Sequence, residues 1–299
     1  MVSRDEVFDR NRPLLFSIAY RMTGSVMDAE DAVQEAYLRW QRASEDEVRS
    51  PSAYLSKVVT RLCIDRLRSA RVRREQYVGP WLPEPLLGEQ AKEIAGKAEL
   101  EDSLSMAFLV LLESLTPVER AVFLLREVFA YEYAEIASLV GKSEANCRQI
   151  SRRARQSLAA RRPRFGSSPQ QEERLQEALH QASIGGDMEA LLELLSENVT
   201  LYSDGGGKTR AALRPIYGAD SVACCLTGIL RNIPPDFAVR QTRVNGRPGL
   251  VGYFGDGSPQ SVVTLEVVEG SIRTIRLVVN PEKLGSVPPL EQAEREDSR

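Results

Sequence analysis

The sequence contains few of the residues that build metal and redox sites. Among its 299 residues there is one histidine, His180, and there are four cysteines. This scarcity, with no C-x-x-C spacing, argues against a Cys/His zinc site and against a disulfide framework. We therefore predict that the protein holds no metal and needs no cofactor. The cysteines are Cys63, Cys147, Cys224 and Cys225.

Long apolar runs are also absent. No stretch approaches the roughly 20 apolar residues that a bilayer crossing requires. The first residues, MVSRDEVFDRNRP, lack the apolar core of a secretory signal. Apolar residues make up 42% of the chain and charged residues 27%, as in ordinary soluble proteins. We expect a cytoplasmic protein of two or three compact domains, without a membrane partner.

The net charge at neutral pH is only −3, which by itself argues against a nucleic-acid partner. The charges are unevenly distributed, however. Residues 49–76 contain eight basic and two acidic residues, and residues 142–164 contain eight basic and one acidic residue. Residues 169–299 are net acidic. Because local patches decide where a polyanion binds, the two basic runs are either solvated helix faces or nucleic-acid contacts.

Residues 28–40 have the spacing of an amphipathic helix. Apolar residues recur every three or four positions from Ala29 to Trp40, which predicts one buried face. A different side is acidic, and it suits either solvent or a basic partner surface. This acidic face consists of Asp28, Asp31 and Glu35, with Gln34 beside them.

A second helix is predicted to start near Pro51, a residue that is common in the first helical turn. Its apolar residues, from Leu55 to Leu62, are expected to face inward. Another side carries a basic stripe that can follow a DNA backbone. The stripe consists of Lys57, Arg61 and Arg68, with Arg71, Arg73 and Arg74 beyond it.

Residues 77–90 cannot form a continuous helix because they contain Pro80, Pro83 and Pro85. Flexible linkers are usually polar, but this segment also contains Trp81 and Leu82. We interpret it as a proline-stiffened linker that docks on another part of the protein. The alternative is a loop whose Trp81 covers a neighbouring core.

Helical patterns return over residues 98–162 and include a helix-turn-helix. Thr116, Pro117 and Glu119 form a capping-box signature for one helix start. A short helix over 133–140, a turn at Gly141-Lys142 and a longer helix from Glu144 to about Ala160 then follow.

The longer helix has two distinct faces. Cys147, Ile150, Ala154 and Leu158 are spaced to pack inward. The opposite face is polar and basic, and such side chains read base edges in the major groove or contact phosphates. A plain alternative is an arginine-rich helix end that interacts with the helix dipole. The outward residues are Asn146, Arg148, Gln149, Arg152, Arg153 and Arg155.

The periodicity changes after the Pro-containing segment 163–169. Two helices broken at Gly185-Gly186 are predicted over 170–196. Strand-like runs follow at 198–203, 237–244, 250–254, 261–268 and 271–279, with a hairpin turn at Glu269-Gly270. Helices followed by an antiparallel sheet predict an α+β domain.

Three segments of the first half resemble a known family. Residues 28–40, DAEDAVQEAYLRW, are similar to the sigma region 2 helix that binds core RNA polymerase. Residues 54–74 resemble the part of region 2 that recognises and melts the −10 promoter element. Residues 115–159, which begin LTPVERAVFLLREVF, resemble sigma region 4. Their order, and the missing region 3, are typical of extracytoplasmic-function sigma factors.

The resemblance implies a role for each surface. The acidic face, Asp28, Asp31, Gln34 and Glu35, would bind core polymerase, whose contacts are the β′ clamp and the β flap. The outward face of the 144–160 helix would recognise the −35 element of promoter DNA. The residues implied at the −10 element are Lys57, Arg61, Asp65, Arg66, Arg68, Arg71, Arg73 and Arg74.

Three further motifs resemble the sigma group that carries a fused SnoaL-like C-terminal domain. They are WLPEP at 81–85, DGGGK at 204–208 and NPEKL at 280–284, where Glu282 replaces the usual Asp. The resemblance implies control in cis by this domain, with no separate anti-sigma factor. The implied regulatory residues are Trp81, Leu82, Pro83, Asp204, Gly205, Gly206, Gly207, Lys208, Asn280, Pro281, Glu282, Lys283 and Leu284.

The residues alone leave the DGGGK segment open between a tight turn and a docking loop, because its glycines allow positive φ and close approach. It lacks the spacing of a nucleotide-binding P-loop. SnoaL-like folds include enzymes, but no acid–base pair emerges here, since the aspartates lie in turn-like contexts. We predict a protein that is not an enzyme, and leave open a small-molecule ligand in the C-terminal cavity. The aspartates are Asp204, Asp220, Asp236 and Asp256.

The predicted fold is multidomain, with two all-α sigma domains followed by an α+β SnoaL-like cone domain. A bacterial sigma factor is the favoured function. The alternative is a ligand-responsive helix-turn-helix regulator that works without core polymerase. The expected boundaries are 1–76 for region 2, 77–97 for the linker, 98–165 for region 4, 166–285 for the SnoaL-like domain and 286–299 for a disordered tail.

Overall fold

The computed structural model describes residues 3–44, 48, 50–74, 76–88, 91, 94, 102–160 and 167–290, with only the backbone for 70–74 and 230. The chain divides into two compact units. The first contains Met1–Gln76, Lys92–Leu104 and Phe108–Arg162, and the second contains Tyr77–Ala91, Ser105–Ala107 and Pro163–Arg299. The proline-containing linker therefore belongs to the second unit.

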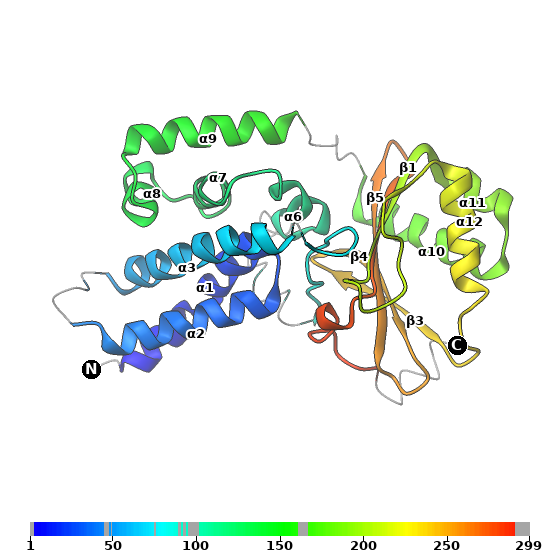
Figure 1. The fold of residues 1–299 in the computed structure, drawn as a ribbon, viewed down its shortest axis with the longest axis horizontal. Helices are drawn as coiled ribbons and strands as arrows, with labels where there is room; N and C mark the ends of the chain where they lie inside the picture. The colour runs from blue at the N-terminus through cyan, green and yellow to red at the C-terminus, as the bar shows by residue number, and fades with distance from the viewer. Residues whose placement is uncertain are drawn as a thin grey trace. The chain divides into compact units, whose positions relative to one another are not determined.

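Three long helices form the N-terminal part of the first unit: α1 (Arg4–Thr23), α2 (Val26–Arg42) and α3 (Pro51–Arg74) (Figure 1). The Ser3 hydroxyl accepts from the Glu6 amide at the start of α1, and Gly24 ends that helix at a φ of 66°. Ser25 caps α2 through the Asp28 amide. The apolar face of α2 is buried, as its spacing predicts.

The second group of helices comprises η2 (Asp102–Leu104), α6 (Met106–Leu112), α7 (Pro117–Phe123), η3 (Leu124–Val128), α8 (Tyr133–Val140) and α9 (Glu144–Ala159). The capping box is present: Thr116 N donates to Glu119 Oε2 at 2.9 Å, and the Thr116 hydroxyl accepts from the Glu119 amide. Gly141, at a φ of 69°, makes the turn between α8 and α9. The predicted helix-turn-helix is confirmed.

Buried arginines join these two groups within the first unit. Arg120 donates to the Met22 carbonyl at 2.8 Å and pairs with Glu113 at 2.8 Å. Arg21 donates to Ser103 Oγ at 2.9 Å. Burial lowers the pKa of Arg120 to about 9 and that of Arg21 to about 10, because a buried cation loses its hydration.

The second unit contains a six-stranded sheet in the order β2-β1-β6-β5-β4-β3. Its strands are β1 (Leu195–Asp204), β2 (Ile216–Tyr217), β3 (Ala238–Val244), β4 (Arg247–Tyr253), β5 (Pro259–Val268) and β6 (Ser271–Val278). The predicted hairpin is confirmed, with positive φ at Glu269 and Gly270. The predicted antiparallel pairing holds for the other neighbours, but the sheet is mixed because β1 pairs with β6 in parallel.

Helices α10 (Pro169–Gly185), α11 (Met188–Leu194) and α12 (Ala219–Leu230) cover one face of this sheet (Figure 1). Their shared core includes Leu191, Leu201, Val222 and Ile275. The sequence did not predict α12, which begins beside Asp220 and not in a turn as we expected. Its sequence, ADSVACCLTGIL, is poor in strong helix formers, so local propensity was uninformative.

The end of the described chain also differs from the prediction. Residues 286–290 were expected in a disordered tail, but Val287 and Leu290 are buried and the Leu290 amide donates to the Gly257 carbonyl at 2.9 Å. The rest of the predicted tail lies outside the described residues. Within the described part of the chain, no helix has the length and hydropathy needed to cross a bilayer.

Candidate nucleic-acid interface and linker-binding site

The outward face of α9 is exposed as the sequence predicts. Cys147, Ala154 and Leu158 are buried against the rest of the first unit, and Ser151 joins them. The single acidic residue of α9 is Glu144, in its first turn. A helix with this face is suited to a DNA groove. The exposed residues are Asn146, Arg148, Gln149, Arg152, Arg153 and Arg155.

Two of these arginines are already held by neighbours. Arg148 pairs with Glu144, and its Cζ lies 4.9 Å from the centre of the Tyr133 ring. Arg126 lies at the same distance from that ring. Arg155 is 3.7 Å from Glu127, which is a longer and weaker ion pair. Tyr133 thus restricts where the Arg148 guanidinium can lie.

The basic stripe on α3, which consists of Lys57, Arg61 and Arg68, is half-buried to exposed. Arg68 pairs with Asp65 at 3.2 Å, and both side chains are well exposed. Arg61 donates to the Leu139 carbonyl at 3.1 Å, near the end of α8. The side chains of Arg71, Arg73 and Arg74 lie outside the described residues.

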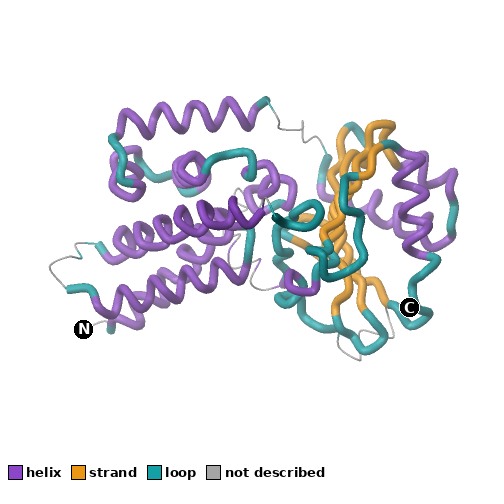
Figure 2. Tube along the Cα trace, viewed as in Figure 1, coloured by secondary structure: helices purple, strands orange, loops and turns teal. Residues whose placement is uncertain are grey.

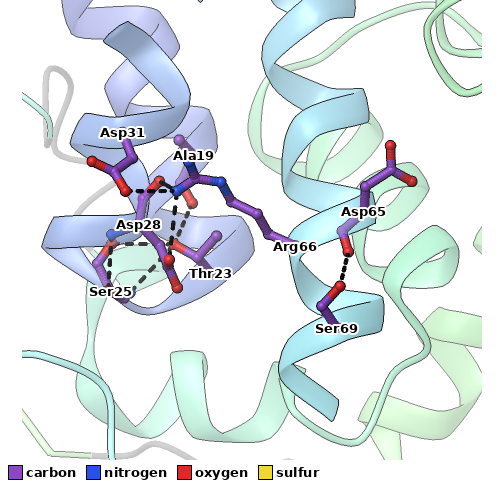
Figure 3. Close-up of polar contacts among 8 residues, drawn as sticks. All are labelled: Ala19, Thr23, Ser25, Asp28, Asp31, Asp65, Arg66 and Ser69. Carbon is purple, nitrogen blue, oxygen red and sulfur yellow. Dashed lines mark hydrogen bonds and ion pairs between the residues drawn. The ribbon is translucent and has the colours of Figure 1, made fainter. Parts of the chain in front are cut away.

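Arg66, which we had placed with the −10 residues, has a different environment. Figure 3 shows its side chain extending toward α2, where it donates to the Asp28 carbonyl at 2.7 Å. It also lies 3.5 Å from a carboxylate oxygen of Asp28 and of Asp31. The structure therefore joins a predicted DNA contact to two residues of the acidic face.

The acidic face of α2 remains open to a partner. Asp31 and Gln34 are exposed, whereas Asp28 and Glu35 are half-buried. Glu35 pairs with Arg39 of the same helix at 2.9 Å. A surface ion pair of this kind contributes little to stability, so the carboxylate stays available to another cation.

The motifs of the second unit meet at a buried carboxylate. The Asp204 side chain, at the end of β1, is fully buried and accepts three hydrogen bonds. They come from the Tyr77 hydroxyl, the Leu82 amide and the Lys283 ammonium, each at 2.7 Å. Two of these donors belong to the linker, which Figure 2 draws as loop beside the sheet. We call Tyr77, Leu82, Asp204, Asn280 and Lys283 the linker-binding site.

Lys283 holds the linker in three ways. Besides its ion pair with Asp204, its ammonium donates to the Leu82 carbonyl. It also lies 4.3 Å from the centre of the Trp81 ring and 5.1 Å from that of Tyr77. A buried cation needs such partners, because losing water costs several kcal/mol per ion, as a rough guide.

Tyr77 completes this arrangement. Asn280 Nδ2 donates to the Tyr77 hydroxyl at 3.0 Å, so that oxygen accepts one bond while it gives another to Asp204. Burial, and then the hydrogen bond to Asp204, raise the pKa of Tyr77. The phenol therefore stays protonated and continues to donate. The linker was predicted to dock, but Tyr77 itself was missed.

The three glycines of DGGGK are required by close approach. At Gly206, with a φ of 58°, a Cβ would lie 2.3 Å from Asn280 Nδ2 and 3.0 Å from the Tyr77 hydroxyl. At Gly207 it would lie 3.2 Å from Val78 of the linker. Both interpretations of this loop therefore apply, since it is a tight turn and it also contacts the linker. Lys208 pairs with Glu282 at 3.2 Å on the surface.

The linker continues along the edge of the sheet. The Leu86 amide donates to Asn245 Oδ1 at 3.1 Å, and the Asn245 amide donates to the Leu86 carbonyl at 2.8 Å. Leu87 forms an antiparallel bridge with Val244 on the edge strand β3. Pro83 and Leu284 are buried, while Pro281 and Glu282 are exposed. Asn245 was missed, although an Asn-Gly pair is a hairpin signal.

The described residues bring together no group of three or more His, Cys, Asp or Glu that could hold a metal ion. Cys63 is fully buried, and burial raises the pKa of its thiol to about 12, which makes it unreactive. Burial lowers the pKa of His180 on α10.

Comparison with known proteins matches both halves of the first unit. Residues 7–73 match the family model described as sigma-70 region 2, and residues 105–158 match sigma-70 region 4. The chain is 35% identical over 293 residues to the ECF RNA polymerase sigma factor SigJ of Mycobacterium tuberculosis, covering 94% of this chain and 93% of that one.

A second relative is the probable ECF RNA polymerase sigma factor SigI of the same species, 33% identical over 278 residues and 92% of each chain. The crystal structure of M. tuberculosis SigJ has a TM-score of 0.77 and 32% sequence identity to this chain. The match covers 95% of this chain and 99% of the SigJ chain. The similarity therefore includes the C-terminal domain, and the predicted fold class is confirmed.

Proposed function

This chain belongs to the extracytoplasmic-function family of RNA polymerase sigma factors. From that premise we propose which surface of the chain binds each promoter element and which binds core polymerase. The protein is a sigma factor. We assign the −35 element to the outward face of α9, the −10 element to the basic stripe on α3, and core polymerase to the acidic face of α2. We assign no chemical reaction to it.

The exposed face of α9 is the observation that carries this proposal. The helix follows the glycine turn at Gly141, and its inward residues fix its orientation on the first unit. Its basic residues and its amides suit guanine and adenine edges, with the remaining arginines on phosphates. The acidic face of α2 suits a basic surface such as the polymerase β′ clamp, because charge complementarity governs specificity and association rate.

Contacts of α3 with α8 and with the loop before α8 indicate that the first unit is in a closed form. The Arg61 side chain donates a hydrogen bond to the Leu139 carbonyl of α8. The hydroxyls of Ser56 on α3 and Tyr131 in the preceding loop are 2.9 Å apart. Elements centred at −10 and −35 are about 25 base pairs apart, or about 85 Å of DNA. The 24 residues of α3 are only about 36 Å long. The two regions therefore have to separate to bind both elements at once.

The linker-binding site limits this separation. The roughly 27 residues between Arg74 and Asp102 could span at most about 90 Å when extended. While residues 77–88 stay bound to the second unit, the roughly 13 residues that follow can span only about 45 Å. The second unit thereby controls the sigma regions in cis, and no separate anti-sigma factor is needed.

Transcription in vitro with bacterial core polymerase and a genomic fragment library tests the assignment. The full chain is expected to give transcripts with defined start sites, and Arg152→Gln is expected to reduce them. Arg174→Gln on α10 removes the same charge from an exposed site outside the first unit, and should leave them unchanged. A chain that binds duplex DNA but never core polymerase would instead be the ligand-responsive regulator.

The control in cis has its own test. Trp81→Ala removes the ring that lies against Lys283 and loosens the linker without a change in the α9 face. Transcript yield is expected to rise, because the sigma regions separate more easily. Unchanged yield, with the linker shown by limited proteolysis to be released, would remove the regulatory claim and leave the sigma assignment intact.

A further inference from the structure

Arg66 lies on a different side of α3 from the basic stripe. At about 100° per residue, Lys57, Arg61 and Arg68 fall within about 40° of one another around the helix axis, whereas Arg66 falls about 180° from Lys57. Figure 3 shows Arg66 extending toward α2, whereas the neighbouring Asp65 points away from α2. A DNA strand that follows the stripe would not reach Arg66.

The strongest contact of Arg66 is with the backbone of α2. Its Nη1 donates to the Asp28 carbonyl at 2.7 Å, which is a short charge-assisted hydrogen bond. The same nitrogen is 3.5 Å from Asp28 Oδ1 and 3.5 Å from Asp31 Oδ2. The Arg66 side chain is 26% exposed, so water only partly screens these contacts.

Asp28 is consequently fixed at both of its backbone groups. Its amide donates to Ser25 Oγ at 3.1 Å, and its carbonyl accepts from Arg66. Asp28 and Asp31 lie one turn apart on the same face, where their like charges repel each other. The guanidinium between them offsets that repulsion and holds both carboxylates on the side of α2 that stays exposed.

Other cations near α2 do not have this arrangement. Arg12 of α1 pairs with Glu30 at 2.8 Å, and both side chains are about as exposed as an ordinary surface pair. Arg39 pairs with Glu35 within α2 itself. Arg4 of α1 also donates to α2 carbonyls, those of Trp40 at 3.2 Å and Gln41 at 3.1 Å, but these lie in the last turn of α2, away from Asp28 and Asp31. Arg66 therefore differs in that it joins an α2 carbonyl to two carboxylates of the acidic face.

We infer that Arg66 is a positioning residue for polymerase binding, and that it orients Asp28 and Asp31 on the acidic face and does not contact DNA. This inference rests on the proposed function of that face. It joins the helix assigned to the −10 element with the helix assigned to core polymerase. A substitution at Arg66 therefore changes the affinity of the acidic face for core polymerase.

Three roles for Arg66 give three different outcomes. A positioning residue weakens core binding when it is removed, because the carboxylates lose their orientation. A purely electrostatic neighbour strengthens it, because removing a cation leaves the acidic face more attractive to a basic partner. A DNA contact leaves core binding unchanged and weakens retention of the −10 strand.

The test measures the dissociation constant of the full chain for core polymerase, without DNA, for wild type and Arg66→Gln. We expect affinity to fall about tenfold, the effect of one charge-assisted hydrogen bond. Arg12→Gln is the matched control, since it removes the same charge from a neighbouring ion pair, and it should change affinity by less than about twofold. Arg66→Lys keeps the charge with a single donor group and should restore part of the affinity.

A second measurement separates positioning from loss of fold. Holoenzyme assembled with saturating core should retain a single-stranded −10 oligonucleotide equally well with wild type and with Arg66→Gln. Equal or tighter core binding by the variant, equal losses with Arg12→Gln, or loss of the oligonucleotide alone would each overturn the inference. If Arg66→Gln does not fold, Arg66→Lys decides the question, and undiminished affinity overturns it. If wild type itself does not bind core, the proposed function fails instead.

Discussion

The linker-binding site and the outward face of α9 both depend on charged side chains, but their surroundings differ. Asp204 and Lys283 are removed from water and bonded to the linker, whereas the arginines of α9 are exposed, with surface ion pairs at Arg148 and Arg155. A buried charge that loses its partner destabilises the fold, while an exposed charge is free to bind something else. The first site therefore organises structure, and the second is the face that we propose for DNA.

The largest effect should come from breaking the buried ion pair. Lys283→Met leaves Asp204 buried without its cation, and we expect a loss of about 3–5 kcal/mol in the free energy of unfolding of the second unit. Chemical denaturation followed by tryptophan fluorescence measures it. Lys208→Met is the matched control, because the Lys208–Glu282 pair is exposed and should cost no more than about 1 kcal/mol. Equal losses would contradict the comparison.

Gly206→Ala should come next. The new Cβ combines an unfavourable positive φ with a clash against Asn280, and we expect a loss of about 2–4 kcal/mol. Gly186→Ala has a similar φ but no atom within 4 Å, so its loss should be only about 1–2 kcal/mol. Thermal unfolding of the two variants separates the cost of the positive φ, which both share, from the cost of the clash, which only Gly206→Ala has. A larger loss for Gly186→Ala would show that the 204–208 loop can shift to accommodate the new Cβ at position 206.

A smaller effect is expected from Tyr77→Phe. The change removes the hydrogen bond that Tyr77 donates to Asp204 and the one that it accepts from Asn280, and it leaves the Leu82 amide and Lys283 in place, so it should cost about 1–2 kcal/mol. Protease cleavage within residues 77–88 should become faster in proportion. Unaltered cleavage would mean that the Leu82 amide and Lys283 hold the linker without help from Tyr77.

The smallest effect on stability should come from Arg152→Gln on α9. The side chain is exposed, and we expect a change within about 0.5 kcal/mol. Its affinity for −35 duplex DNA should nevertheless fall, and the slope of log affinity against log salt should decrease by about one if Arg152 contacts a phosphate. A loss of stability with unchanged DNA binding would reverse the roles assigned to the two regions.

The helices of the first unit could be predicted because their signals are local. The Thr116–Glu119 capping box, the Gly141 turn and the two faces of α9 are each defined by residues within one or two turns of each other. The structure agrees with these predictions at nearly every residue. Tertiary contacts reinforce local preferences there, so sequence patterns were sufficient.

The linker-binding site was predictable only in outline. An apolar, proline-containing segment indicated docking, and the family resemblance named the three motifs. Its actual centre depends on bonds between Tyr77 or Leu82 and residues more than a hundred positions later. Spacing within the chain carries no signal for such pairs. The parallel pairing of β1 with β6 was missed for the same reason.

The contact of Arg66 with α2 was missed because composition does not record direction. It lies in a run of basic residues, and charge counting placed it with them. Its angular position on α3 was already available from the helical repeat, since it falls opposite Lys57. Applying that geometry to each residue separately, instead of to the whole run, would have found the contact with α2.

The distance along the chain between the linker and its partners has a consequence during synthesis. Leu82 and Lys283 are 201 residues apart, so a ribosome that adds about 5–20 residues per second produces the second about 10–40 s after the first. Throughout that interval the apolar segment around Leu82 and Leu86 lacks the surface that buries it. A nascent chain at this stage is therefore a natural client for chaperones, and a gene truncated before the last strand would leave the segment permanently uncovered.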